Sequence, residues 1–183
     1  MNVQSNGFGP IDARVRIGHV HLKVADLRRS LAFYCGVLGL ELKQRFDDSA
    51  AFLAAGDYHH HIALNTWESL GGGAPAAGST GLYHLAIVYP TRALLAEALH
   101  RLIAGRIPLE GASDHGVSES LYLRDPDGNG VELYWDRPRE LWPQTPDGRL
   151  AMFTHRLDLE GLLSEANFGL DENRSLGTGP PDL

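Results

Sequence analysis

Apolar and polar residues along the first part of the chain follow a strand pattern and then a helix pattern. Residues 17–26 alternate in polarity, which is typical of a β-strand with one buried face. Residues 27–38 then carry apolar side chains at helical spacing, with Asp26 as the N-cap and Gly39 as the stop. Further strands are expected at 40–46, 51–55 and 60–66. The pattern thus predicts a strand, a helix and three more strands.

The second part of the chain repeats this order. Residues 81–91 have the strand pattern, and Thr91 caps a predicted helix that ends near Gly105. This helix carries one apolar stripe, made of Leu94, Leu95, Ala98, Leu99 and Leu102. Strands are expected at 107–110, 120–124 and 131–135. A βαβββ unit used twice gives an α+β fold, which is the fold class that the sequence predicts.

A segment rich in glycine and proline joins the two units. Residues 71–81 have the composition of a loop or flexible linker, and no Lys-Ser/Thr or GxGxxG pattern makes them a phosphate cradle. The predicted parts are an N-terminal extension, a first module, a second module and a C-terminal extension, at 1–14, 15–70, 82–137 and 138–183. We expect a short helix at about Asp158–Glu165. The rest of the C-terminal extension is expected to be either an arm on a second subunit or a frayed terminus.

Composition limits the kinds of chemistry and partner. The chain has 183 residues, 43% of them hydrophobic and 21% charged, as expected for a soluble globular protein. We expect no export signal, because residues 1–10 have neither a basic start nor an apolar stretch, and no apolar segment approaches the roughly 20 residues of a membrane-spanning helix. A net charge of -7 without a basic run argues against nucleic acid as a partner. The single cysteine, Cys35, fits a reducing cytoplasm and excludes a thiolate cluster, so nine histidines point to imidazole and carboxylate chemistry.

A histidine, a tyrosine and a glutamate surround a turn signal in the second module. His115 is followed by Tyr122 in a short apolar run, then by the turn Asp125-Pro126-Asp127-Gly128, then by Glu132. Two strands joined by such a turn can return both polar side chains to one place, where they can serve a metal. The alternative is an ordinary hairpin whose Tyr122 and Glu132 face water. The turn alone does not decide between these two interpretations.

Two further histidines occupy equivalent positions in the two modules. His19 lies seven residues before Asp26, and His84 lies seven residues before Thr91. His21 shares a strand face with His19, because strand residues two apart point to the same side, but it lacks this offset. We therefore single out His19 and His84.

A repeated βαβββ unit with His19, His84 and Glu132 at these positions resembles the vicinal-oxygen-chelate superfamily, in which two such modules form an open, cupped mixed sheet around a metal. The stretch from His115 to Glu132 resembles the extradiol ring-cleavage dioxygenase motif: a histidine, a spacer, an aliphatic-Tyr pair, two residues, Asp-Pro, one residue, Gly and, after a few residues, Glu. The resemblance covers about residues 15–137 and is closest to the single-domain, two-module catechol 2,3-dioxygenase-like group.

The resemblance implies a metal site made of His19, His84 and Glu132. Two imidazoles and one carboxylate form the facial triad that suits Fe(II), which leaves adjacent positions for a bidentate substrate and dioxygen. Manganese tolerates the same donor atoms and zinc accepts them, so residue type alone does not fix the metal. We expect Fe(II), with Mn(II) as the alternative cofactor.

Residues 59–61 are three consecutive histidines. Such a run can be an incidental surface cluster or an adventitious metal patch. The resemblance implies instead that His60, three residues before Ala63 on the last strand of the first module, is the acid/base, a task that suits an imidazole near neutral pH. Strand alternation would direct His60 inward and His59 and His61 outward.

The implied activity is extradiol (meta) cleavage of a catechol by O2 at a non-haem Fe(II) site, which gives a ring-opened semialdehyde acid. In this reaction His60 would take a proton from the substrate, Tyr122 would hydrogen-bond a substrate oxygen, and His115 would orient that end of the ring. We expect a homo-oligomer, a dimer or tetramer, in the cytoplasm. Two alternatives stay open. The first is a glyoxalase-like isomerase or lyase, which commonly has a fourth metal ligand, Glu, where this chain has its three histidines. The second is a non-catalytic resistance or binding protein of the superfamily.

Overall fold

The first module is a four-stranded sheet with one helical segment. The computed structural model describes residues 9–166, so the outer parts of both expected extensions lie outside the described residues. The strands form the order β1-β4-β3-β2, in which β1 and β4 run parallel and the others antiparallel. The elements are β1 (Val20–Lys23), α1 (Leu27–Leu31), a π-helical segment η1 (Ala32–Val37), β2 (Glu41–Phe46), β3 (Ala50–Ala54) and β4 (Ile62–Asn65).

The second module repeats this topology and is followed by three short elements. Its sheet has the order β5-β8-β7-β6-β9, again with the first and last strands of the module, β5 and β8, parallel. The module consists of β5 (Leu85–Val88), α2 (Arg92–Ala104), β6 (Leu109–Asp114), β7 (Ser118–Arg124) and β8 (Gly130–Asp136). After it come the 3-10 helix η2 (Arg139–Leu141), β9 (His155–Arg156) and α3 (Leu159–Leu163). The two sheets confirm the predicted α+β fold of two βαβββ modules.

Both predicted helix starts are confirmed by their caps. The Asp26 side chain accepts a hydrogen bond from the Arg29 backbone N–H at 3.0 Å, and Thr91 accepts one from the Leu94 N–H at 3.2 Å. Each bond satisfies a backbone donor that has no partner within its helix. The helix α2 also ends as predicted, with Gly105 as its C-cap.

The first helix differs from its prediction along its length. Instead of one α-helix over 27–38, α1 ends at Leu31 and the chain continues as a π-helical segment. At its end the Leu38 N–H donates to the Phe33 carbonyl, five residues earlier, at 3.0 Å. Apolar spacing does not distinguish an α-helical turn from this wider one, which is a rare local variant.

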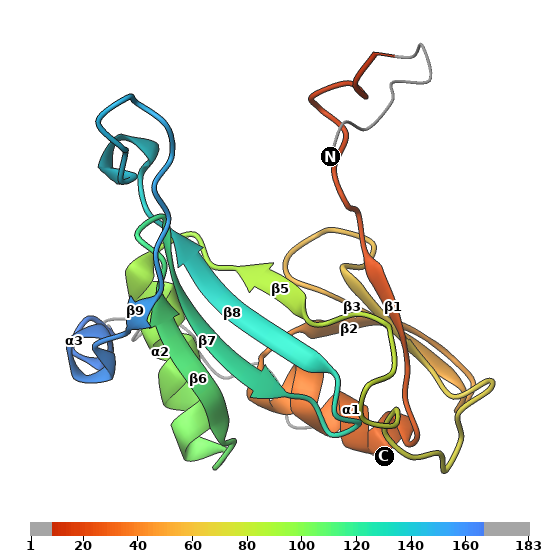
Figure 1. Cartoon of the computed structure of the whole chain (residues 1–183). Helices are drawn as coiled ribbons and strands as arrows, with labels where there is room; N and C mark the ends of the chain where they lie inside the picture. Colours follow the sequence, from red (N-terminus) through yellow and green to blue (C-terminus); the bar gives the residue numbers. More distant parts are fainter. Residues whose placement is uncertain (1–8, 167–183) are drawn as a thin grey trace.

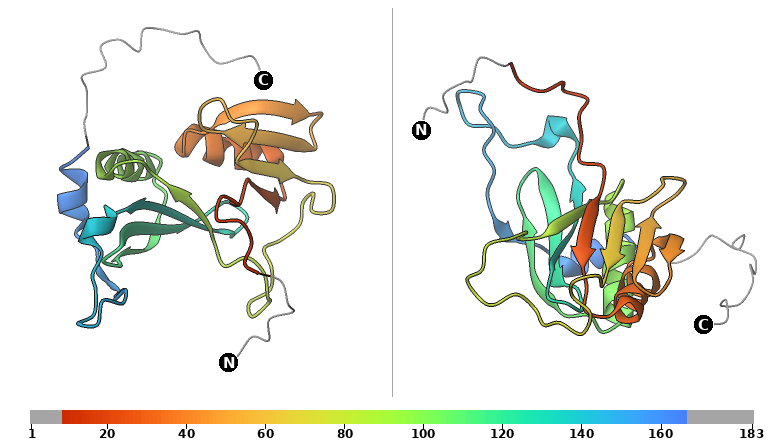
Figure 2. Two further views of the ribbon diagram at one scale, coloured as in Figure 1. Left: turned by 90° about the horizontal axis from the view of Figure 1, so that it is seen from above. Right: turned by 90° about the vertical axis from the view of Figure 1, so that its right-hand side faces the viewer.

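Side chains from both modules join in one hydrophobic core. Figure 1 shows the two sheets inclined to each other, with α2 covering one face of the second sheet, and the left view of Figure 2 shows α1 against the first sheet. Buried residues of both helices and both sheets belong to the same cluster, and its largest fully buried members include Leu53, Leu64, Leu95, Leu121 and Leu133. The modules are therefore held together by shared apolar burial.

Hydrogen bonds also connect the β7–β8 turn to the first module. Asp127 accepts bonds from the Ala25 N–H at 2.9 Å, from Arg29 Nη2 at 2.6 Å and from the Ser30 hydroxyl at 3.2 Å. The buried Tyr34 hydroxyl donates to Asp125 Oδ2 at 2.9 Å. These contacts of Asp125 and Asp127 with the first helical segment are called the inter-module latch below.

The described part of the C-terminal extension packs on its own chain; the expected arm on a second subunit stays a prediction, and the end of the extension after residue 166 lies outside the described residues. Residues 138–166, here named the C-terminal strap, add β9 to the edge of the second sheet beside β6. The expected helix near 158–165 is present as α3, with Asp158 as its N-cap. Leu157 and Leu162 are buried in the core. No helix within residues 9–166 is long and apolar enough to cross a membrane.

Candidate active site

Two of the predicted metal ligands meet in the second module. His84 directly precedes β5, and Glu132 lies on the neighbouring strand β8, opposite Ala86. His84 Nε2 and Glu132 Oε2 are 2.9 Å apart, and the Glu132 side chain is only 13% exposed. The parallel pairing of the first and last strands of the module therefore places an imidazole and a carboxylate side by side.

Gly130 makes this close approach possible. A Cβ atom at residue 130 would lie 2.1 Å from the Tyr83 carbonyl oxygen and 2.9 Å from the His84 Cβ. Any larger residue would separate the start of β8 from the backbone that carries His84. The sequence analysis did not predict this role of Gly130. An Asn-Gly pair before a strand is also a turn signal, so the pair alone does not indicate that two backbones approach closely.

The His84–Glu132 pair fits a divalent metal. Two ligand atoms bound at right angles and about 2.1 Å from one metal are ~3 Å apart, close to the observed separation. Imidazole nitrogen with carboxylate oxygen is a donor combination that iron, manganese and zinc accept. His84 Nδ1 is buried and has no hydrogen-bond partner among the described residues, so the only polar contact of this ring is with Glu132.

Tyr122 and His115 extend this pair into a row of four side chains. Tyr122 lies directly opposite Glu132 in the β7–β8 ladder, and its hydroxyl donates to Glu132 Oε1 at 3.0 Å. His115 Nε2 is 2.8 Å from the same hydroxyl. Burial raises the pKa of Tyr122, and its contact with Glu132 raises it further, so the phenol keeps its proton at neutral pH. The row of His84, Glu132, Tyr122 and His115 is named the His84 network.

His19 lies apart from the His84 network. It directly precedes β1, the position equivalent to that of His84, but its ring is next to the His60 ring, with centroids 4.4 Å apart. Within residues 9–166, no group of three histidine, cysteine, aspartate or glutamate side chains is close enough to hold a metal ion. Four of the six predicted site residues thus lie together in the second module as the His84 network. The remaining two, His19 and His60, lie together in the first module.

His60 lies in the loop before β4 rather than on the strand. The predicted strand at 60–66 begins only at Ile62, because residues 55–61 form the connection from β3. The His60 ring packs edge-on against Phe52, with centroids 5.0 Å apart, and is less exposed than those of His59 and His61. Burial and the neighbouring histidines lower its pKa, so the ring is a neutral proton acceptor at pH 7.

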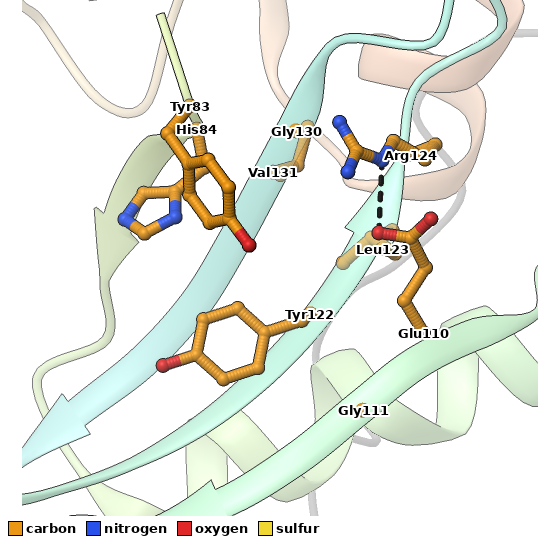
Figure 3. A pocket seen from close by; sticks show the side chains of 9 residues that line it. All are labelled: Tyr83, His84, Glu110, Gly111, Tyr122, Leu123, Arg124, Gly130 and Val131. Atoms are coloured by element: carbon orange, nitrogen blue, oxygen red, sulfur yellow. Dashed lines mark hydrogen bonds and ion pairs between the residues drawn. The ribbon is translucent and has the colours of Figure 1, made fainter. Parts of the chain in front are cut away.

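A cavity of about 320 Å3 lies beside His84 and Tyr122. Figure 3 shows the rings of Tyr83, His84 and Tyr122 along one side of it and the ion pair of Arg124 with Glu110, with Nε and Oε2 2.8 Å apart, at the other. This volume lies within the range of small-molecule sites. Tyr83, Glu110 and Arg124 were not predicted as site residues, since their spacing carries no motif.

The comparison with known families decides the identity of the fold. The family model described as the Glyoxalase/Bleomycin resistance protein/Dioxygenase superfamily matches residues 16–133. The chain belongs to this superfamily. The match ends before the C-terminal strap, which is therefore an addition to the two modules that define the superfamily.

Relatives within the superfamily include ring-cleaving enzymes. The chain is 44% identical over 151 residues to a catechol-2,3-dioxygenase of Bacillus subtilis, which covers 82% of this chain and 52% of that protein. It is 35% identical over 127 residues to the biphenyl-2,3-diol 1,2-dioxygenase 3 of Rhodococcus globerulus, which covers 66% of this chain and 63% of that protein. The chain thus spans only about half to two thirds of these relatives.

Solved structures of the superfamily share the fold. A lactoylglutathione lyase from Agrobacterium tumefaciens is 27% identical, with a TM-score of 0.53, and the match covers 68% of this chain and 96% of that one. A glyoxalase/dioxygenase from Nostoc punctiforme has a TM-score of 0.59 at 22% identity, and the match covers 72% of this chain and 97% of that one. The second likeness shows the fold alone.

Proposed function

We propose that the protein is an extradiol ring-cleaving dioxygenase that acts on a catechol-type aromatic diol with O2. The observation that carries this proposal is the His84 network, which joins two metal-donor side chains to a tyrosine and a histidine beside a small-molecule cavity. The 44% identity to a catechol-2,3-dioxygenase supports the same reaction class. Fe(II) is the proposed metal, with Mn(II) as the alternative.

His84 and Glu132 would hold the metal, and His19 is the proposed third ligand. The chemistry that a bound Fe(II) supplies is electron transfer between a chelated diol and O2. Glu132 carries the negative charge needed beside a divalent cation, and Tyr122 orients the carboxylate through its second oxygen. The assembly state, expected to be a dimer or tetramer, stays a prediction.

Three further side chains have proposed roles in the reaction. Tyr122, from one wall of the cavity, would hydrogen-bond a substrate oxygen, and His115 would orient that end of the ring through Tyr122. His60, a neutral imidazole near pH 7, would accept a proton from a substrate hydroxyl. Tyr122, Leu123 and Val131 give the cavity an apolar wall against which an aromatic ring could pack.

The position equivalent to Glu132 in the first module argues against a four-ligand isomerase. Glu132 lies opposite Ala86 on β5, and the corresponding pair in the first module is Ala63 opposite His21 on β1. Alanine offers no donor atom, so the acid expected of a glyoxalase-like site is absent from that position. The lactoylglutathione lyases among the relatives are also more distant, at 27–29% identity.

The proposed function is tested by anaerobic loading with Fe(II), followed by catechol and then air. We expect a yellow ring-opened product from the wild-type protein and none from His84→Ala under the same conditions. Metal content is measured in both samples before air is admitted. If the wild-type protein, with iron bound, leaves a series of simple catechols unchanged, the proposal is wrong and an isomerase or binding role is favoured.

A further inference from the structure

One row of residues on the face of the second sheet joins the two ends of the cavity. His84, directly before β5, lies against Gly130 of β8, and Gly130 pairs with Arg124 of β7. Neighbouring strands lie about 4.8 Å apart, so the backbones that carry His84 and Arg124, two strands apart, are separated by roughly 10 Å. The next row on this face holds Glu132 and Tyr122, directly opposite each other. Arg124 thus shares a face with the proposed metal ligands, because residues two apart on a strand point to the same side.

Two glycines leave the floor of the cavity open between His84 and Arg124. Gly130 contributes no side chain in the middle of the row. Gly111 of β6, opposite Tyr122, leaves a second gap on this face. Both glycines line the cavity of about 320 Å3, and Figure 3 shows His84 and Arg124 at its two ends with Gly130 between them. A cavity of this size and shape can hold a small aromatic molecule along the row.

Arg124 has unused hydrogen-bond donors at its end of the cavity. Its Nε donates to Glu110 Oε2 at 2.8 Å, and its Nη1 donates to the Gly128 carbonyl at 3.2 Å. A guanidinium has five N–H groups, so the other three, all on the Nη atoms, have no hydrogen-bond partner within residues 9–166. The two bonds hold the planar group in one orientation, and the remaining donors are available to a ligand.

The ion pair of Arg124 with Glu110 contributes little to folding. The two side chains are 44% and 52% exposed, and water screens an ion pair of this exposure. The hydrogen bond with Glu110 raises the pKa of Arg124, so the guanidinium keeps its positive charge. A charged, oriented arginine in a cavity wall suits an anionic group of a bound molecule, and a carboxylate matches the planar arrangement of its donors.

We propose that Arg124 is a specificity-determining residue of the site, and that the cavity takes an aromatic diol with a carboxylate on the side of the ring away from the diol. The inference rests on the proposed function, which places the diol beside His84 and Glu132. The carboxylate binds the free Nη donors of Arg124, and the ring lies over Gly130. Because the row spans only two strand spacings, the carboxylate is attached to the ring itself or to a short side chain.

Glu110 has two opposing effects on such a ligand. Its hydrogen bond orients the guanidinium, but its negative charge lies beside the place of the carboxylate and repels it. Glutamine at this position keeps an oxygen acceptor for Arg124 Nε and removes the charge. Arg124→Gln and Glu110→Gln are therefore expected to change the binding of a carboxylate in opposite directions. A purely structural ion pair would give changes in the same direction, because either substitution breaks the same pair.

An acid and its methyl ester distinguish recognition of charge from recognition of shape. The probes are 3,4-dihydroxybenzoate and 3,4-dihydroxyphenylacetate, each compared with its uncharged methyl ester. Dissociation constants are measured by NMR titration of the full-length, metal-free protein, so that no turnover consumes the probe. We expect the wild type to bind at least one acid about 10-fold or more tightly than its ester, because charge-assisted hydrogen bonds are stronger than neutral ones. This preference should disappear in Arg124→Gln and increase several-fold in Glu110→Gln.

The substitution Arg45→Gln is the matched control. Arg45 is also an exposed arginine in an ion pair, 2.8 Å from Asp48, but it lies on β2 of the first module and does not line the cavity. The preference for the acid should therefore equal that of the wild type. Arg124→Lys keeps the charge without the planar arrangement of donors and should retain only part of the preference.

The binding measurements and the ring-cleavage assay separate the two proposals. A preference for the acid that depends on Arg124 supports this inference, even if the iron-loaded protein cleaves no catechol. Ring cleavage by a wild-type protein that binds acid and ester equally, or that binds neither acid, supports the proposed function and overturns this inference. A preference that persists in Arg124→Gln, or that falls in Glu110→Gln, also overturns it, because the carboxylate would then bind elsewhere.

Discussion

Tyr122 joins the proposed metal ligands to the rest of the site. Its hydroxyl contacts Glu132 on one side and His115 on the other, and its ring forms part of the cavity wall. The β7–β8 ladder places Tyr122 directly opposite Glu132. A single hydroxyl group therefore connects Glu132 with His115 at the edge of the cavity.

The substitution Tyr122→Phe should lower kcat more than it weakens substrate binding. The ring that fills the strand face is kept and only the hydroxyl is lost, so a donor that acts mainly in the transition state is removed. The stability change is expected to be about 0.5–1.5 kcal/mol, as for one hydrogen bond. Steady-state kinetics at matched iron content provide the measurement, and unchanged turnover would remove Tyr122 from the mechanism.

The substitution His60→Ala should leave metal binding intact and slow turnover by about 10²-fold or more, because a proton acceptor contributes to the transition state and not to coordination. The pH profile gives a second readout. In the proposed reaction His60 acts as a neutral base, and because its pKa is lowered from 6.5, wild-type activity should persist to lower pH before this group becomes protonated. His61→Ala is the control, because the His61 ring is more exposed than that of His60 and stacks on Tyr58. Loss of metal in His60→Ala would instead identify His60 as a ligand.

At the residue scale, the motif in the second module was more informative than isolated histidines. His84 was singled out by its strand position, and His115, Tyr122 and Glu132 by a turn signal together with the resemblance to the extradiol motif; the structure joins all four at hydrogen-bond distances. The partners that support them could not be predicted. Phe153 contacts His115 through its backbone carbonyl, and Gly130 allows a close approach because it lacks a side chain, so neither contact follows from side-chain chemistry.

At the scale of elements, the β7–β8 turn has two functions. It brings Tyr122 and Glu132 together, and its Asp125 and Asp127 form the inter-module latch with the first helical segment. Asp125 is only 4% exposed and also accepts hydrogen bonds from the backbone of Asp127 and Asn129. One turn therefore fixes both the candidate site and the relation between the two modules.

The substitution Tyr34→Phe should destabilise the protein by about 1–3 kcal/mol, because it leaves a buried carboxylate without one of its donors. Burial, followed by the neighbouring Asp125, raises the pKa of Tyr34, so its hydroxyl is a donor throughout the range in which the protein is folded near neutral pH. Urea unfolding gives the free energy of unfolding. Tyr58→Phe is the control, since Tyr58 is 41% exposed. Equal stability of both variants would mean that the latch contributes nothing.

Elements with local signals were predicted best. The helix starts at Asp26 and Thr91 follow from capping chemistry, which depends on residues within one turn. The start of β4 at Ile62 instead of residue 60 depends on pairing with β1 and β3, and the latch depends on contacts between modules. Both are set by residues distant in sequence, which periodicity does not report.

At the scale of the whole molecule, the predicted ligand set requires residues from both modules. His19 belongs to the first module and the His84–Glu132 pair to the second, so a three-ligand site depends on how the two sheets face each other. The shared core and the latch hold the modules together, yet they do not bring His19 into the His84 network in the structure. The third ligand is therefore the most informative point to test.

If His19 is the third ligand, His19→Ala should lose as much metal as His84→Ala after dialysis against a weak chelator. A facial site with one of its three protein donors removed binds a divalent ion much more weakly. His21→Ala is the control, because His21 lies two residues further on, in β1, but contacts Asn65, at 2.9 Å, and Trp67. Elemental analysis gives metal per chain. Full retention in His19→Ala would restrict the site to the second module.

The pairing of the first strand of each module with its last has a consequence for biosynthesis. β5 lies at the edge of its sheet and pairs only with β8, so His84 leaves the ribosome long before its partner Glu132. Translation at about 5–20 residues per second separates their appearance by on the order of 2–10 s. During that interval the nascent chain offers an unpaired strand edge and only half of a chelating pair. Metal acquisition by the proposed site would then follow completion of the second sheet, because before that time His84 lacks its partner carboxylate.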